Sequence, residues 1–216
     1  MEIDFEAIEP QNRYKLLVGF VIPRPIALVT TRSPAGVDNA APFSFFNVFS
    51  EDPAMVVLGL QRRPDGTLKD TARNILDTGE FVVNMVDEAI AEAMNLCSVD
   101  FPPEKSEPKI SGLAIEPSRL VKPGRLADSP VSMECRHIQT IEFKPTRSLV
   151  LGEVVWMRAR DDVIDSGTLR VRDDAYRPVG RLYAHQYARQ RDRFELVRQT
   201  YPEWLEDQRE KEPAGS

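Results

Sequence analysis

The sequence has few of the residues that most often bind metals or form crosslinks. Its 216 residues include only two histidines and two cysteines, Cys97 and Cys135. The cysteines lie far apart and lack the paired spacing of zinc ligands, and two histidines are too few for a histidine-rich metal site. Two thiols in a chain of this size are typical of a reducing cytoplasm, and whether these two ever pair is left open.

Several sequence motifs that identify enzymes are also absent. Neither GxGxxG nor GxxxxGK[ST] occurs, so the chain has no Rossmann fingerprint and no P-loop. HExxH and GxSxG are missing too, which removes the common signatures of zinc proteases and α/β-hydrolases. If the protein is an enzyme, its chemistry has to come from a less local pattern or from a bound cofactor.

The charge and hydropathy of the chain exclude other classes. The net charge is −6 and the isoelectric point is about 5.1, so nucleic acid and anionic membranes are poor candidate partners. No apolar run approaches the ~20 residues that span a bilayer. The acidic start MEIDFEAIEP lacks the basic region and apolar core of a secretory signal, so we expect a cytoplasmic protein.

Hydrophobic periodicity predicts many short strands with a few helices between them. The pattern is typical of a mainly β protein with α insertions, arranged as a β-barrel. Gly79 is expected to close one helix in a left-handed conformation. Strands are predicted over 26–32, 38–49, 54–60, 80–86, 114–116, 131–143 and 148–158, and helices over 11–20, 67–77, 87–96 and 193–204.

The stretch from Arg24 to Asn47 is the part around which we expect the rest to be organised. It holds a β-rich run bounded by prolines, a Ser-Pro-Ala-Gly turn, and a second run of small and aromatic residues. A strand with small side chains at Ala41 and Ser44 lets a flat ligand approach its backbone. Taken by themselves, the residues are better explained as a core hairpin of any β domain.

The segment LKDTARNI, residues 68–75, is the best local candidate for a phosphate site. Lys69 supplies a cation, Thr71 a hydroxyl group, and the start of a helix offers unpaired N–H donors and a favourable dipole. Taken by itself, the segment is better explained as an ordinary helix start in which Lys69 and Arg73 form a solvated pair.

Four blocks of the sequence together resemble a known family, and this resemblance favours the phosphate site over an ordinary helix start. They are VIPRPIALVTT, NAAPFSFFNVFS, LKDTARNI and GEFVVNMV, in that order. Their order and spacing resemble the flavin reductase-like family, the FMN-binding split β-barrels, over roughly residues 14–187. The resemblance implies one flavin-binding split-barrel domain over 1–190. The remaining residues, 191–216, hold the predicted C-terminal helix and a charged tail over 206–216, which its composition predicts to be disordered.

The resemblance also implies which residues bind FMN. The phosphate-binding segment of the family matches Lys69, Asp70, Thr71 and Asn74, with Asp70 capping or orienting because like charges repel. Arg24 would face the phosphate or the flavin pyrimidine, or else be a surface charge. Other residues would line the ribityl chain and the isoalloxazine ring; these are Thr30, Thr31, Asn39, Ala41, Pro42, Phe43 and Ser44.

Two histidines have different expected roles. His137 sits inside an alternating strand and is interpreted as structural. His185 follows Gly180 and Arg181 in a segment that the family places near the open face of the flavin, where it could contact a nicotinamide donor. Alternatively, it is a structural residue of a closing strand, hydrogen-bonded to the barrel.

The resemblance implies an FMN-binding oxidoreductase to which NAD(P)H passes a hydride, with no obligate acid or nucleophile on the protein. Two alternatives remain open. One is a flavin-carrying electron-transfer protein without a nicotinamide site, and the other is a split barrel that binds flavin without catalysis. The resemblance also implies a homodimer with each flavin at the subunit boundary.

Overall fold

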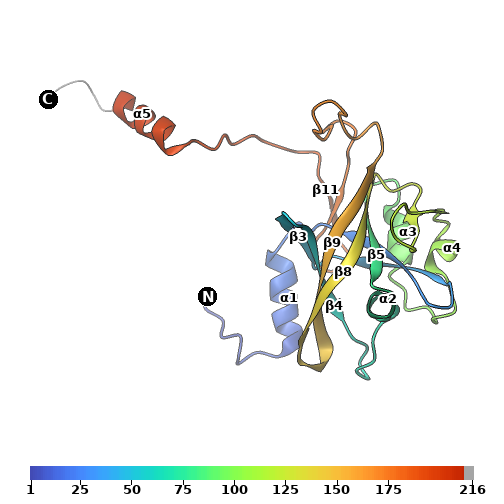
Figure 1. The fold of residues 1–216 in the computed structure, drawn as a ribbon. Coiled ribbons are helices and arrows are strands. Elements are labelled where there is room, and N and C mark those ends of the chain that lie inside the picture. The colour runs from blue at the N-terminus through green and yellow to red at the C-terminus, as the bar shows by residue number, and fades with distance from the viewer. Residues whose placement is uncertain (212–216) are drawn as a thin grey trace.

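A seven-stranded antiparallel sheet forms the centre of the computed structural model, which describes residues 1–211 (Figure 1). The strand order is β2-β1-β5-β8-β9-β4-β3. The long strands β8 and β9 form its middle and pair along most of their length. The bounds are β1 Ala27–Arg32, β2 Asp38–Phe43, β3 Phe46–Glu51, β4 Ala54–Gln61, β5 Glu80–Met85, β8 Val131–Phe143 and β9 Arg147–Ala159.

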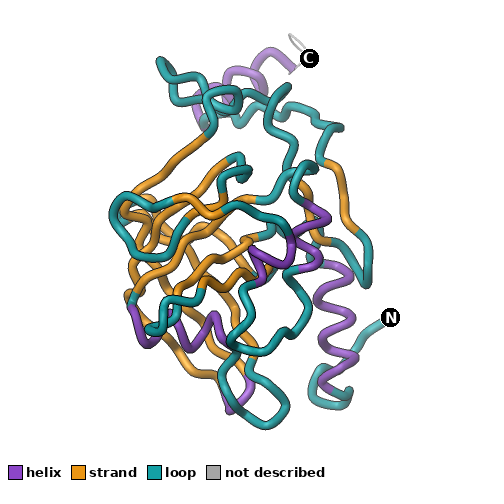
Figure 2. The backbone as a smooth tube through the Cα atoms, turned by 90° about the vertical axis from the view of Figure 1, so that its right-hand side faces the viewer, coloured by secondary structure: helices purple, strands orange, loops and turns teal. Residues whose placement is uncertain are grey.

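The sheet has to curl, because its two edge strands are consecutive in the chain. Only Ser44 and Phe45 separate β2 from β3. Seven strands about 4.8 Å apart would put the edges of a flat sheet roughly 29 Å apart, whereas a two-residue link spans at most roughly 10 Å. The sheet therefore bends until its edges meet, and Figure 2 shows the strands wrapping around a common interior.

The two edges meet at the link between them without pairing as strands. The carbonyl of Phe45 accepts a 2.7 Å hydrogen bond from the amide of Gly59 in β4. A Cβ atom at position 59 would lie 2.9 Å from the Cβ of Phe45, so this approach requires glycine. The result is a barrel that is split between β2 and β3.

Helices and two small hairpins surround the barrel. Helix α2 begins beside the β1–β2 hairpin and ends at Gly79, whose φ of 72° confirms the predicted left-handed cap. The remaining elements are short. The bounds are α1 Pro10–Phe20, α2 Asp70–Thr78, α3 Ala91–Leu96, α4 Glu107–Ser111, α5 Tyr201–Lys211, the 3-10 turn Lys144–Thr146, and the strands β6 Ile115–Glu116, β7 Arg125–Leu126, β10 Val179–Arg181 and β11 Tyr187–Arg189.

Two buried clusters form the core, one on each face of the β1 side of the sheet. Because side chains alternate along a strand, Val29 points into the first cluster and Leu28 into the second. The first fills the barrel and is covered by Ile75 of α2. The second packs against α3 through Met94. The hairpin formed by β1 and β2 is therefore held from both sides.

The structure confirms the predicted fold class and corrects several element bounds. Strand 131–143 was predicted with its observed bounds, because its alternation is long and regular. The single strand predicted over 38–49 is wrong: it is two strands, β2 and β3, since the chain crosses from one edge of the sheet to the other at Ser44 and Phe45. The helix predicted over 87–96 begins only at Ala91, and Asp87 instead pairs with Arg160 and accepts a 3.1 Å hydrogen bond from the amide of Ala89 in the preceding turn.

The C-terminal prediction is also corrected. Residues 190–200 have no regular secondary structure, and the helix α5 begins at Tyr201, so the helix predicted over 193–204 is wrong in its bounds. Residues 206–211, predicted as part of a disordered tail, lie in α5. The rest of that tail, 212–216, lies outside the described residues. Whether 1–190 folds as a separate domain stays a prediction.

Candidate functional site

The β1–β2 hairpin is bound to the start of helix α2 by two side-chain bridges. The amide nitrogen of Asn39 donates to the hydroxyl of Thr71 at 3.0 Å, and that of Asn74 donates to the hydroxyl of Thr31 at 3.0 Å. All four side chains are buried, so the bonds are shielded from water. The structure thus brings together four residues that the sequence predicted from three separate blocks.

These bonds leave donors available at the start of α2. A threonine hydroxyl can accept and donate at once, so Thr71, which accepts from Asn39, keeps its own proton to give. The helix is preceded by Lys69 in extended conformation, and no side chain caps its first amides. A free helix start next to an ammonium and a hydroxyl group is a suitable site for a phosphate monoester.

The carboxylates next to this helix start already have partners. Asp70 pairs with Arg63 at 3.1 Å, in agreement with an orienting role. Lys69 pairs with Asp100 at 2.8 Å; the Asp100 side chain is 74% exposed. An exposed pair of this kind is weak, so an incoming phosphate can replace Asp100 as the partner of Lys69.

Two neighbouring hollows run along the edge strand β2 beside this cluster. One, of about 120 Å³, is lined by Asn39, Ala41 and Thr71, and the other, of about 200 Å³, by Ser44, Tyr14 and Arg147. Both are also lined by Pro42, Phe43 and Lys69. Proline is tolerated there because an edge strand has no ladder bond to lose on its outer side. The arrangement provides an elongated groove with a cation at its centre.

A buried carboxylate supports the outer edge of β2. Glu107 of α4 accepts a 3.2 Å hydrogen bond from the backbone amide of Ala40. Burial raises the pKa of Glu107 above its ordinary value. Cys97 also lines the first hollow, and burial raises the pKa of its thiol. Both cysteines are buried and free.

Arg24 is a buried structural anchor at the far end of the groove. Its guanidinium donates to the carbonyls of Val18, Val21 and Leu182 and to the hydroxyl of Ser44 at distances of 2.7–3.3 Å. Burial lowers the pKa of its guanidinium. The surface-charge alternative is therefore wrong. No hydrogen bond of Arg24 goes to the Lys69 cluster; it touches the groove only through Ser44.

Thr30 lies on the opposite face of β1 from Thr31. Its hydroxyl donates to the carbonyl of Gly124 at 2.6 Å and accepts from Asn84 at 3.1 Å. Asn84 continues this buried network through the hydroxyl of Ser132. The Thr30 side chain is thus committed to the second core cluster, and a contact with a ligand in the groove is not supported.

The two histidines lie outside the groove. His137 contacts the hydroxyl of Thr140 at 2.8 Å, and burial lowers its pKa, consistent with the structural role predicted for it. His185 is exposed in the turn between β10 and β11. Within the described residues its side chain makes no hydrogen bond, so the barrel-bonded alternative is not supported. Its hairpin reaches the groove indirectly, through the bonds of Arg24 with Arg181 and Leu182.

Sequence reasoning missed several residues of the site. Asp100 and Glu107 come from the stretch 99–108, whose three prolines are typical of a loop, and neither was predicted as a site residue. They are 31 residues from Lys69 and 67 residues from Ala40, respectively, and no local pattern links them. Tyr14, whose ring lies 6.4 Å from that of Phe45, was predicted only as a helix residue.

Two common features are not found in the described part of the chain. Residues 1–211 hold no group of three or more metal-binding side chains. None of the helices described there is long and apolar enough to cross a membrane.

Comparison with known proteins shows which families and structures share this architecture. The model of the flavin reductase like domain matches residues 19–180. The structure of 2-nitrobenzoate 2-nitroreductase NbaA from Pseudomonas fluorescens is 41% identical, with a TM-score of 0.86 over 93% of this chain and 98% of that one. Nitrilotriacetate monooxygenase component B from Bacillus cereus is 32% identical, with a TM-score of 0.87 over 91% and 98%.

A more distant structure supports the fold alone. A flavin reductase with a split barrel domain from Shewanella frigidimarina is 20% identical, with a TM-score of 0.77 over 93% of this chain and 99% of that one. The split between β2 and β3 agrees with that description.

Proposed function

Because the chain belongs to the flavin reductase-like family, we propose that it is an FMN-binding oxidoreductase that uses NAD(P)H as hydride donor. The observation that carries the proposal is the groove along β2 with Lys69 and Thr71 at the start of α2. The two side-chain bridges to the β1–β2 hairpin hold this phosphate-binding geometry in place before a ligand arrives.

The residues present fit the terminal phosphate of FMN. Lys69 and Thr71 would bind the phosphate together with the first amides of α2, while Asp70 stays bonded to Arg63. The backbone of Ala41–Ser44 would lie along the flavin ring. Bound FMN would supply the redox chemistry, and the protein would supply binding, orientation and electrostatics. The sequence shows no second nucleotide-binding motif, which favours FMN over FAD.

Two measurements test the cofactor and the donor. The purified protein should release FMN on heating, as identified by chromatography; recovery of FAD alone, or failure to bind added FMN, would contradict the proposal. Anaerobic mixing with NADH or NADPH should bleach the flavin absorbance. Flavin that binds but is not bleached by either nucleotide would support the electron-transfer or non-catalytic alternative.

A nitroaromatic acceptor is a second, more specific proposal. It is supported by the 41% identity to NbaA, which is a 2-nitrobenzoate reductase. Arg147 lines the second hollow and would suit the carboxylate of such a substrate, while Lys69 stays with the FMN phosphate. Anaerobically reduced protein should be reoxidised by 2-nitrobenzoate faster than by nitrobenzene. If the two compounds reoxidise the protein equally fast, or hardly at all, the nitroaromatic proposal is wrong. The better interpretation is then that the protein delivers reduced flavin to a separate oxygenase.

We also propose a homodimer in the cytoplasm. An apolar face formed by the end of α1 and by β3 stays uncovered in the single chain, with Phe20 82% and Val48 71% exposed. The two free, buried thiols are consistent with a reducing compartment. Light scattering should give twice the mass of the chain at micromolar concentration with FMN bound, and a monomer mass would contradict the dimer.

A further inference from the structure

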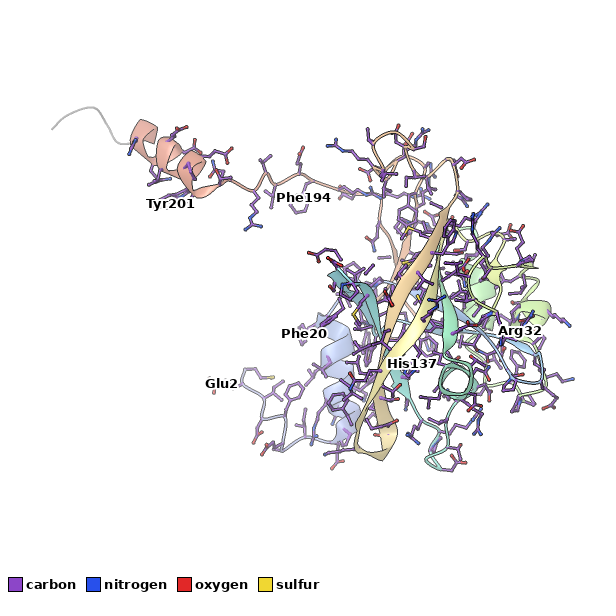
Figure 3. The ribbon with its side chains drawn as sticks, viewed as in Figure 1. Glu2, Phe20, Arg32, His137, Phe194 and Tyr201 are labelled. Atoms are coloured by element: carbon purple, nitrogen blue, oxygen red, sulfur yellow. The ribbon has the colours of Figure 1, made fainter. Side chains whose placement is uncertain are left out.

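The C-terminal arm, residues 194–211, extends away from the barrel (Figures 1 and 3). It begins as an extended segment and ends in α5. Three apolar side chains of the extended part, Phe194, Leu196 and Val197, are each at least 80% exposed. Apolar side chains spaced this closely and left in water are a recognised feature of interaction surfaces.

The root of the arm is fixed to the barrel. Arg189 and Arg191 both pair with Glu88, at 2.9 and 2.7 Å, and Arg193 pairs with Asp173. Hydrogen bonds from the two arginines lower the pKa of Glu88. The arm therefore leaves the molecule at a defined place and in a defined direction.

The helix at the end of the arm is specified by its own sequence. Thr200 and Glu203 form a reciprocal capping box, in which the Thr200 amide donates to the Glu203 carboxylate at 2.6 Å. The rings of Tyr201 and Trp204 stack with centroids 6.0 Å apart, yet both remain exposed. The helix thus forms locally and carries an aromatic surface without a partner.

An apolar face without a partner lies on the side of the barrel toward which the arm points. It consists of Phe20 and Val21 at the end of α1 and of Val48 and Phe49 on β3, and each of these side chains is at least 60% exposed. Strand β3 is also an outer edge of the sheet, with no further strand beside it in the described residues. Figure 1 shows the arm extending past α1 and β3, and Figure 3 shows Phe20 on the same side.

We propose that the arm of each chain lies on the α1–β3 face of a second copy, and that the exchange is reciprocal. The inference rests on the proposed homodimer. A two-fold axis beside the α1–β3 face would place the partner under the overhanging arm and make the contact isologous.

Charge also favours a second copy as the occupant. Residues 194–209 of the arm hold four acidic residues and two arginines, whereas α1 of the receiving face carries Arg13 and Lys15 and no acidic residue. An acidic arm and a basic helix attract one another across an interface between copies.

The first test measures dimer strength in the full-length chain. The triple variant Phe194→Ser, Leu196→Ser, Val197→Ser should raise the dimer dissociation constant by about a hundredfold in analytical ultracentrifugation, because three buried apolar side chains are lost. The matched control is Leu169→Ser, since Leu169 is 75% exposed and lies on a different loop. It should leave the dissociation constant unchanged. An unchanged constant in the triple variant would overturn the proposal.

The second test locates the arm. Because both native cysteines are buried, a benzophenone maleimide should label only the new thiol of Val197→Cys. Irradiation should join two chains, with the crosslinked peptide mapping to α1 or β3 of the other copy. A crosslink within one chain would show that the arm folds back onto its own barrel. A dimer without interchain crosslinks would reject the exchange of arms but not the dimer. A protein that stays monomeric at all concentrations would reject the dimer and the exchange together.

Discussion

Removal of the Lys69 ammonium provides the sharpest test of the proposed phosphate site. Lys69 precedes the first turn of α2 and lines both hollows along β2. A charge-assisted hydrogen bond to a phosphate is worth roughly 1.5–3 kcal/mol. Lys69 must give up its pair with Asp100, which as an exposed pair is worth about 0.2–1 kcal/mol. The difference, about 1.5 kcal/mol, predicts that Lys69→Ala weakens FMN binding about tenfold.

The assay is a fluorescence titration with FMN and, in parallel, with riboflavin, which lacks the phosphate. Lys69→Ala should weaken FMN binding and leave riboflavin binding unchanged, because only FMN carries the group that Lys69 contacts. Lys105→Ala is a matched control, since Lys105 is an exposed lysine of the nearby loop. Equal weakening of both flavins would indicate a damaged fold. Unchanged FMN affinity would refute the phosphate site and return residues 68–75 to an ordinary helix start.

Three further predictions concern Asp100, His185 and Glu107. Asp100→Asn should strengthen FMN binding by up to about fivefold, since Lys69 no longer has to break a pair; weaker binding in the same titration would contradict this. His185→Ala should retain FMN and its midpoint temperature, because the side chain is exposed, but slow flavin reduction by NAD(P)H; a normal stopped-flow rate would reject a role for His185 at the donor. Burial raises the pKa of Glu107, so the folded state keeps the carboxyl protonated to a higher pH than the unfolded state does. The contribution of Glu107 to the free energy of unfolding is therefore full below the unfolded pKa and falls as pH rises above it. Glu107→Gln, which can still accept from Ala40, should flatten that fall in melting curves recorded from about pH 4 upward, and an unchanged pH profile would contradict the raised pKa of Glu107.

Much of the fold could be predicted because its signals are local. The regular alternation of residues 131–143 predicted β8 with its observed bounds, and Gly79 ends α2 in the left-handed conformation that glycine adopts most easily. The segment 68–75 was placed at a helix start, and the described helix begins within it. These features depend on residues only a few positions apart.

The break between β2 and β3 was decided by the tertiary structure. Residues 38–49 read as one β-rich run, because nothing in their pattern shows that Ser44 and Phe45 join opposite edges of the sheet. The crossing follows from barrel closure, which depends on all seven strands. The arm is a similar case: its helix has a local capping box, but the extended residues before it have no local pattern that shows where they lead.

The candidate site also has one part that the sequence predicted and another that only the tertiary structure shows. The sequence by itself determined which residue types are present, and the order and spacing of four blocks predicted the family and the cluster of Asn39, Thr71 and their neighbours. Only the tertiary structure decided that Arg24 is buried against Leu182, 158 residues away, and that Asp100 reaches Lys69. The physical reason is that such contacts depend on how separate elements pack, and packing at long sequence separation leaves no periodic signal in the chain.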